Sequence, residues 1–144
     1  MPSPHPVIMC GKTEAIGAAV IEDLKPELEV VQFVQSIEIG KQQIPALLRG
    51  ESPGPSGSIL GTKNFEKSPV AVLLGAAFDD QGVKELREAA AGTKEVPWLR
   101  PDTSKPAPPL GPEYGKAMAA RIKETIKTLE SEGKLEGNGT VVWF

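Results

Sequence analysis

The chain has 144 residues, 40% of them hydrophobic, which is enough for one compact domain and too few for two sizeable ones. Its net charge of −3 gives no overall attraction to nucleic acid or to an anionic membrane, and no apolar run approaches the roughly 20 residues of a membrane helix. A single cysteine excludes an internal disulfide, and with only one histidine beside it we expect no metal site.

The first residues, Met-Pro-Ser-Pro-His, have neither the basic start nor the apolar core of a signal peptide. We therefore expect a cytoplasmic protein with no membrane partner, in which residues 1–5 form a loose arm. His5 is then a surface histidine, since it could become catalytic only if this arm folded back onto the domain.

The N-terminal part of the chain predicts a βαβ unit. An apolar run, Val7 to Cys10, stops at Gly11, and a helical pattern then continues until Pro26. A second β-rich run, Leu28 to Val34, follows. Strand, glycine turn, helix and strand predict a parallel pair with a right-handed crossover. The turn opens at the carboxyl end of the first strand, where such sheets bind ligands.

The rest of the chain continues to alternate between helices and strands. We expect a buried strand at 69–75, a short strand at 95–99 and a terminal strand at 140–144. The expected helices are 36–50, a segment capped by Asp79 or Asp80 that ends at Gly92, and the long segment 113–132.

This alternation predicts a single three-layer α/β domain over 1–144, Rossmann-like, with about five mostly parallel strands in the order 2-1-3-4-5. Two long Gly/Pro-rich loops, 51–68 and 100–112, interrupt it. A loop as long as 51–68 is uncommon in compact domains, so we expect it to be functional or mobile. The proline-rich loop 100–112 is a candidate lid or partner surface, and its prolines reduce the entropy lost on ordering it. A sheet this short leaves edges that need covering, and the apolar strand 140–144 makes a homodimer one solution.

A ligand crevice is expected above the first, third and fourth strands, walled by Gly11–Gly17, Ala76–Asp80, Arg100–Asp102 and Tyr114. Arg100 and Asp102 follow the fourth strand, and Tyr114 begins the long helix, where its hydroxyl could donate a proton or contact a ligand. These three are the candidate catalytic residues. A salt bridge that fixes the loop is an equal alternative for Arg100 and Asp102, and Trp98 either lines the crevice or fills the core.

The turn offers a candidate cofactor or anion site made of Gly11, Lys12, Thr13 and Gly17. We favour the simpler interpretation of a solvated lysine and a helix-capping threonine. Cys10 ends a strand near a helix N-terminus, where a thiol pKa can fall, but a lone cysteine on an apolar strand is more often part of the core.

Several of these segments resemble atypical, NmrA-like short-chain dehydrogenase/reductases. The first turn of that family has glycines spaced G-x-x-G-x-x-G, and here Gly11, Glu14 and Gly17 stand at those positions. Val70 to Gly75 is similar to the family's fourth strand, and Tyr114 to Met118 lies where the family has its Tyr-x-x-x-Lys pair. The resemblance implies an NAD(P)-binding Rossmann-like domain and, with it, NADP as a cofactor.

Three departures from that pattern argue against redox chemistry. Glu14 puts a bulky anion where the middle glycine should admit a pyrophosphate. Gln35 and Ser36, rather than an acidic residue, end the second strand, where the ribose would bind. Met118 replaces the catalytic lysine, so no cation at that spacing lowers the pKa of Tyr114. We therefore expect no redox cofactor, with NADP as the alternative.

Three functions remain open. The first is a small-molecule protein that uses no redox cofactor, either a binder or a non-redox enzyme such as an isomerase, lyase or cyclase. The second is a truncated reductase that binds NADPH despite Glu14. The third is an interaction or regulatory module whose two Gly/Pro-rich loops form the contact surface. We place the first ahead of the third because polar residues cluster at the strand ends, where ligands usually bind.

Overall fold

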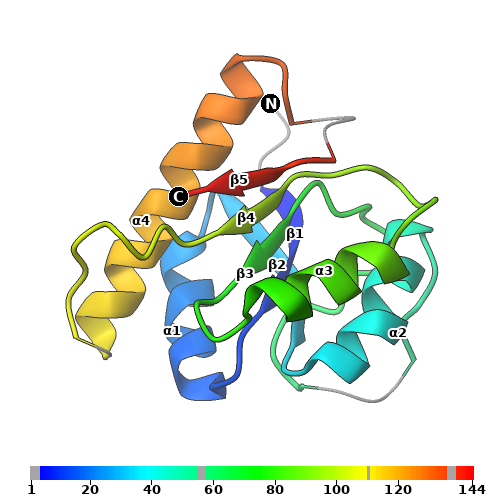
Figure 1. Cartoon of the computed structure of the whole chain (residues 1–144), viewed down its shortest axis with the longest axis horizontal. Coiled ribbons are helices and arrows are strands. Elements are labelled where there is room, and N and C mark those ends of the chain that lie inside the picture. Colours follow the sequence, from blue (N-terminus) through cyan, green and yellow to red (C-terminus); the bar gives the residue numbers. More distant parts are fainter. Residues whose placement is uncertain (1–3, 55–57, 110, 136–138) are drawn as a thin grey trace.

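The computed structural model describes residues 4–54, 58–109, 111–135 and 139–144, and within them five parallel strands form one sheet with four helices around it (Figure 1). The strands lie in the order β2-β1-β3-β4-β5, so the predicted three-layer Rossmann-like fold is confirmed. The strands are β1 (His5–Cys10), β2 (Leu28–Val34), β3 (Val72–Leu74), β4 (Trp98–Arg100) and β5 (Val141–Trp143). The helices are α1 (Glu14–Leu24), α2 (Ile37–Leu48), α3 (Asp80–Ala89) and α4 (Pro112–Ser131).

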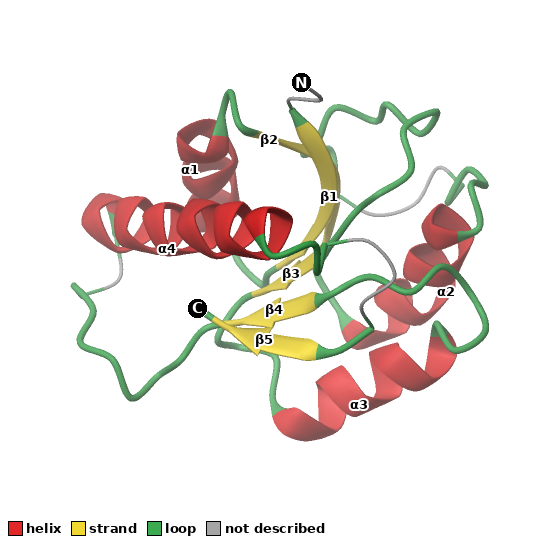
Figure 2. Cartoon of the chain, turned by 90° about the horizontal axis from the view of Figure 1, so that it is seen from above, coloured by secondary structure: helices red, strands yellow, loops and turns green. Residues whose placement is uncertain are grey.

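The helices cover the two faces of the sheet in pairs. Figure 2 shows α1 and α4 on one face, and α2 and α3 on the other. Each face has its own hydrophobic core, and successive residues of a strand alternate between the two, as Leu73 and Leu74 do. Strands buried on both faces explain why the sequence of β1 and β3 is apolar without alternation.

The turn between β1 and α1 is held from below by the ring of Phe33. The backbone N–H of Gly11 donates to the carbonyl of Val34 at 2.9 Å, which joins the turn to the end of β2. A Cβ placed on Gly17 would lie 2.6 Å from the Phe33 ring, and one on Gly11 would lie 3.2 Å from it. Gly17 is therefore required by packing between α1 and β2, whatever else binds at this turn.

Two of the predicted helix starts are confirmed in detail. The side chain of Ser36 accepts from the backbone N–H of Ile39 at 3.2 Å and caps α2, which continues through Pro45 to Leu48. The Asp79 carboxylate accepts from the N–H of Gly82 at 2.8 Å and caps α3. One of the two aspartates after β3 is thus the cap, as the sequence indicates.

The edge of the sheet at β2 is covered by part of the 51–68 loop. The N–H groups of Thr62 and Lys63 donate to the carbonyls of Val30 and Val31 at 2.9 and 3.0 Å. Gly61 permits this approach, because its φ is +100° and a Cβ there would lie 2.9 Å from the Val31 carbonyl oxygen. Residues 62 and 63 of this loop are therefore fixed to the edge strand by backbone hydrogen bonds.

Buried polar side chains fix the same loop. The Lys63 ammonium donates to the Gln32 side-chain oxygen at 2.7 Å and to the Ser58 carbonyl at 2.6 Å, while Gln32 donates to Gln43 of α2 at 2.7 Å. Gln32 and Gln43 are each 1% exposed, so these hydrogen bonds satisfy groups that water cannot reach. Partial burial lowers the pKa of Lys63, because desolvation disfavours its charged form.

Two predicted segments need correction. His5 is not part of a loose arm: it begins β1, and its ring lies 3.2 Å from the Glu130 carboxylate of α4, while residues 1–3 of the predicted arm lie outside the described residues. The fourth strand is not 95–99 but Trp98–Arg100, because Pro97 ends the preceding loop instead of lying within the strand. No helix in the described part of the chain is long and apolar enough to cross a membrane.

Gly17→Ala should lower the free energy of unfolding by about 1–3 kcal/mol, because the new methyl group overlaps the Phe33 ring. Gly115→Ala in α4 is the matched control, because its Cβ would meet Val20 at 3.4 Å, an ordinary contact. The higher helix propensity of alanine should then raise the free energy of unfolding by about 0.5–1 kcal/mol. Urea unfolding of both variants measures the difference. Equal effects of the two substitutions would contradict the packing role of Gly17.

Glu29 should make stability depend on acid pH. Burial alone would raise the pKa of its carboxyl, but hydrogen bonds from Lys67 at 2.7 Å and Thr62 at 2.6 Å outweigh this and hold the pKa below its ordinary value of 4.5. The pKa is lower in the folded state, so this stabilisation is complete above pH 4.5 and is lost as the pH falls through the lowered pKa.

Glu29→Gln should therefore cost about 1–3 kcal/mol near neutral pH and progressively less in acid. Urea unfolding over a pH series measures this, with Glu66→Gln, at an exposed position of the same loop, as the control. If the free energy of unfolding of Glu29→Gln differed from that of the natural chain by the same amount at every pH, the assigned role of the Glu29 carboxylate would be wrong.

Candidate functional site

A cavity of about 360 Å³ opens at the carboxyl ends of β1 and β3, between α1 and α4. The chain places β2 on one side of β1 and β3 on the other, so this is the point where the direction of sheet growth reverses. Open α/β sheets bind their ligands at such points. The sequence predicts a crevice above the first, third and fourth strands; the cavity lies above the first and third, and only Pro101, after the fourth, reaches it.

Most of the cavity wall is apolar. Met9 and Leu73 from the strands form its base, and the Phe33 ring lies beneath the turn. Further apolar side chains come from the two helices and from the end of the chain: Ile16, Val20, Met118, Ile122 and Phe144. These walls favour a ligand that is itself largely apolar, because little of its surface would find a polar partner here.

Three polar side chains line the cavity: Tyr114, Lys12 and Thr13. Tyr114 lies on the first turn of α4 and is partly buried against the α1–α4 core. Lys12 is exposed, with its ammonium 5.8 Å from the centre of the Phe78 ring. Thr13 precedes α1, but its side chain makes no capping hydrogen bond, contrary to the interpretation that we favoured. Its hydroxyl is therefore not engaged as a helix cap.

Glu14 has a partner inside the protein. It begins α1, and its carboxylate accepts a hydrogen bond from the hydroxyl of Ser58, which is 6% exposed. The backbone N–H of Leu60 donates to that same hydroxyl at 3.1 Å. The carboxylate of the first residue of α1 is thus held near the positive end of the helix dipole by the loop that covers β2.

Arg100 is directed away from the cavity. It is the last residue of β4, and its guanidinium donates to the Asp80 carboxylate at 2.7 Å and to the Phe78 carbonyl at 3.2 Å. The Trp143 ring lies 4.8 Å from the guanidinium carbon. All three contacts are on the α2–α3 face of the sheet, opposite the cavity. The expected salt bridge exists, but with Asp80 rather than Asp102.

Asp102 also lies outside the cavity. Hydrogen bonds from the side chain and backbone N–H of Ser104 hold the pKa of its carboxyl below the ordinary range, and its backbone N–H donates to the Phe144 carbonyl at 2.7 Å. Of the segment Arg100–Asp102, only Pro101 lines the cavity. Tyr114 is thus the one proposed catalytic residue that the structure brings to it, while Trp98 belongs to the core against α2 and α3.

Cys10 borders the cavity, but its side chain packs in the core on the opposite face. It is 1% exposed, and burial raises the pKa of its thiol far above the ordinary value. The core interpretation is the one that this geometry supports. Among the described residues, no three His, Cys, Asp or Glu side chains lie together where they could hold a metal ion.

The sequence did not indicate the roles of Phe33 and Phe144. Both are buried aromatic residues on strands or strand ends, and both line the cavity. Nothing local distinguishes them from other core residues, since their role depends on the crossing of α1 and α4. Met118, which stands where the resembling family has the lysine of its Tyr-x-x-x-Lys pair, does line the cavity, but as an apolar residue.

Comparison with known proteins gives one informative relative. The chain is 40% identical over 139 residues to "Kojic acid related protein 6" of Aspergillus oryzae, and the match covers 94% of this chain and 84% of the relative. The chain belongs to the family of kojic acid related protein 6. No family model and no solved structure matches the chain.

Cys10 should react at least about 100-fold more slowly with a disulfide reagent in the native protein than in denaturing urea, because the reaction needs an accessible thiolate. It is the chain's only cysteine, so the colour released reports this thiol alone. A native rate close to that of the unfolded chain would contradict its burial and return Cys10 to the list of candidate nucleophiles.

Proposed function

We propose that the chain binds a small, mostly apolar molecule in the cavity between α1 and α4 and uses no redox cofactor. The supporting observation is the cavity itself, which lies at the switch point of the sheet and is walled by Phe33, Met118 and Phe144. Its volume of about 360 Å³ is near the lower end of the roughly 300–1,000 Å³ typical of ligand pockets. A compact ring compound matches that volume better than an extended dinucleotide does.

The polar groups narrow the ligand class further. Tyr114 offers one hydroxyl, and Lys12 offers a positive charge at the mouth. A flat ring with one or two oxygen substituents would bury its faces against the apolar walls and direct its oxygens to these groups. The relative's name connects that protein with kojic acid, and we extend the connection to this chain as a proposal that its ligands are oxygenated ring compounds.

A reaction at this site would be limited to proton transfer. Tyr114 is the cavity residue best placed to donate or accept a proton, and Met118, one helical turn away, gives it no cation. In isomerases, lyases and cyclases that use no redox cofactor, such a transfer assists the bond making or breaking within the substrate itself. A binding protein needs none, so both remain within the proposal.

NADP is the alternative ligand, favoured by the glycine spacing of the turn and its resemblance to short-chain reductases. The residues present fit it poorly. The Glu14 carboxylate at the N-terminus of α1 would repel a phosphate there. Gln35 stands where an acidic residue would bind the ribose, and its side-chain amide donates to the Lys12 carbonyl at 3.5 Å. The regulatory-module alternative has weaker support, because the 58–67 part of one candidate contact loop is engaged in covering β2.

Kojic acid and a panel of oxygenated ring compounds should raise the melting temperature of the natural chain, and NADPH should not. Ala77→Trp should abolish this shift, because Ala77 is an exposed rim residue and a large side chain there blocks the mouth. Asp102→Ala, outside the cavity, is the matched control and should bind normally.

Binding can be localised by nuclear magnetic resonance shifts of the Ile16, Val20 and Ile122 methyl groups. Shifts elsewhere, or equal binding by Ala77→Trp, would contradict the site. Micromolar binding of NADPH by the natural chain would overturn the proposal in favour of a reductase. Binding gained only by Glu14→Gly would instead support it, since the anion at the turn would then be what excludes the dinucleotide.

A further inference from the structure

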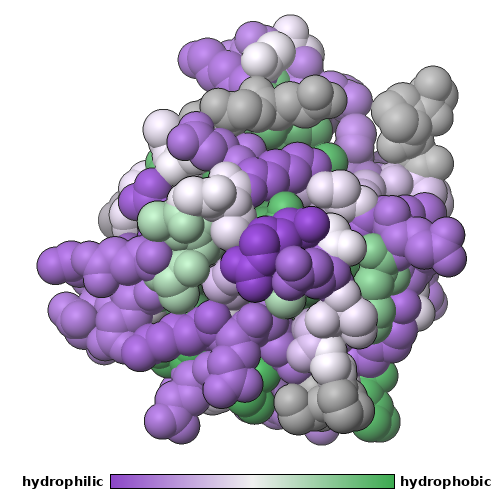
Figure 3. Space-filling model, turned by 90° about the vertical axis from the view of Figure 1, so that its right-hand side faces the viewer, coloured by the Kyte–Doolittle hydropathy of each residue, from purple (hydrophilic) through white to green (hydrophobic). Residues whose placement is uncertain are grey.

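The outer edge of β5 carries an exposed tryptophan. Trp143 is 53% exposed, and the only other large hydrophobic side chain as exposed among the described residues is Ile59, in the loop over β2. The side of the molecule formed by α2 and α3 is mostly hydrophilic (Figure 3). Trp143 is thus a large exposed aromatic residue at a sheet edge, a position that calls for an explanation.

The backbone of β5 has hydrogen-bonding groups that face outward. Trp98 donates to the Thr140 carbonyl and Phe144 donates to the Arg100 carbonyl, each at 2.9 Å, so Thr140 and Phe144 face β4. Alternation along a strand then directs the N–H and C=O of Val141 and Trp143 away from the sheet. No strand of the described chain lies beyond β5. Its edge is a template for another strand.

A groove lies on each side of this edge. On the α3 side, a hollow of about 450 Å³ has the apolar residues Val83, Ala91 and Val141 in its wall, together with five charged residues: Asp80, Lys84, Arg87, Glu88 and Arg100. On the α4 side, a hollow of about 550 Å³ runs between that helix and β5. The surface available to a partner is therefore wider than the three-residue strand alone.

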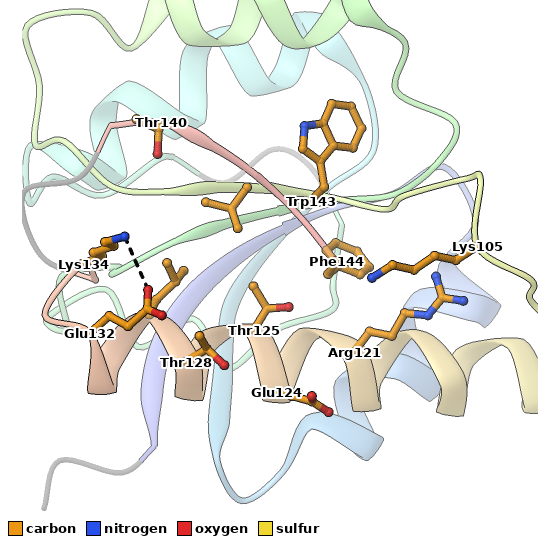
Figure 4. Close-up of a pocket in the computed structure, with 12 residues that line it drawn as sticks. Lys105, Arg121, Glu124, Thr125, Thr128, Glu132, Lys134, Thr140, Trp143 and Phe144 are labelled. Atoms are coloured by element: carbon orange, nitrogen blue, oxygen red, sulfur yellow. Dashed lines mark ion pairs between the residues drawn. The ribbon is translucent and has the colours of Figure 1, made fainter.

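The two ends of the α4 groove differ in charge (Figure 4). Arg121 and Lys105 lie at the end near Phe144, and Glu132 lies at the end near Thr140, paired with Lys134 at 3.5 Å. Rotation by 180° about an axis through the middle of β5 exchanges these ends. The rotation brings Arg121 toward Glu132 of the second copy, whose carboxylate would then be shared between Lys134 and Arg121.

We propose that two copies of this chain pair through β5, antiparallel, about a two-fold axis at Val142. In this register Val141 lies opposite Trp143 of the partner subunit, and every outward N–H and C=O of the two residues finds a partner. A register shifted by two residues would leave some of these groups unpaired. The result is one continuous sheet through both copies.

Side-chain packing in this register uses the α3 groove. Val141 and Trp143 point to the same face of the sheet, so Trp143 of the partner subunit lies over Val141 and enters the hollow beside Val83 and Ala91. On the other face, Val142 meets its own copy, and Arg121 approaches Glu132 of the partner subunit. Each copy thus contributes one Trp143, one hollow that receives the tryptophan of the partner, and one Arg121 and Glu132. This reciprocity is what an isologous interface requires.

Sedimentation equilibrium of the full chain should show a dimer at micromolar concentration. Trp143→Lys should raise its dissociation constant at least about thirtyfold, since a central tryptophan carries much of the energy of an interface. Ile59→Lys makes the same change at the other exposed hydrophobic residue and should leave the constant unchanged. A monomeric natural chain, or equal weakening by the two variants, would overturn the proposal.

Two further variants test the register and separate it from binding of some other strand. Val142→Cys, with Cys10→Ser, should form an intermolecular disulfide on mild oxidation, because residues at a non-hydrogen-bonded antiparallel pair lie about 4.5 Å apart between Cα atoms. Thr140→Cys, also with Cys10→Ser, should not form this disulfide, because residue 140 lies opposite residue 144 of the other copy and not opposite residue 140.

Arg121→Glu should weaken the dimer, and Arg121→Glu with Glu132→Arg should restore it. Arg121 also donates to the Pro106 carbonyl, so restoration by the double variant, which a loosened loop would not give, is the decisive result. A disulfide from Thr140→Cys rather than Val142→Cys would refute this register.

Discussion

The contact between the Phe33 ring and the glycines of the first turn determines the geometry of the whole α1–α4 side. With no Cβ at Gly17, α1 approaches β2 closely enough for the ring to fill the space beneath the turn. α4 then packs on α1, where Gly115 meets Val20, and the cavity is the space that these two helices leave above β1 and β3. The glycine spacing that resembles a nucleotide-binding turn is thus also demanded by the protein's own interior.

The two faces of the sheet differ in chemistry at the same carboxyl edge. On the α1–α4 face the strand ends border an apolar cavity, with Pro101 and Phe144 contributing from β4 and β5. On the other face the end of β4 carries Arg100, held by Asp80 and the Phe78 carbonyl against Trp143. The Arg100–Asp80 ion pair thus lies on the other face of the sheet from the cavity, and Lys12 is the charged residue among those that line the cavity.

The features predicted correctly from sequence are those that local patterns determine. Parallel order, the Asp79 cap and the position of the cavity follow from apolar runs, cap residues and the glycine turn. The orientation of Arg100 was not predictable, because a strand that begins three residues later than expected includes Arg100 and turns its side chain to the opposite face. The hydrogen bond from Lys63 to Gln32 joins residues 31 positions apart, and no local sequence pattern predicts such a contact.

The loop that lies along β2 makes the two borders of the sheet unequal. Backbone groups of Val30 and Val31 are already engaged by residues 62 and 63 of the same chain, so that border offers no further strand a place to add. Open-ended stacking of one molecule on the next requires two receptive borders per molecule, and here one is sealed. Growth by edge-to-edge addition therefore stops after a single step, which protects a molecule with an apolar terminal strand from forming fibrils.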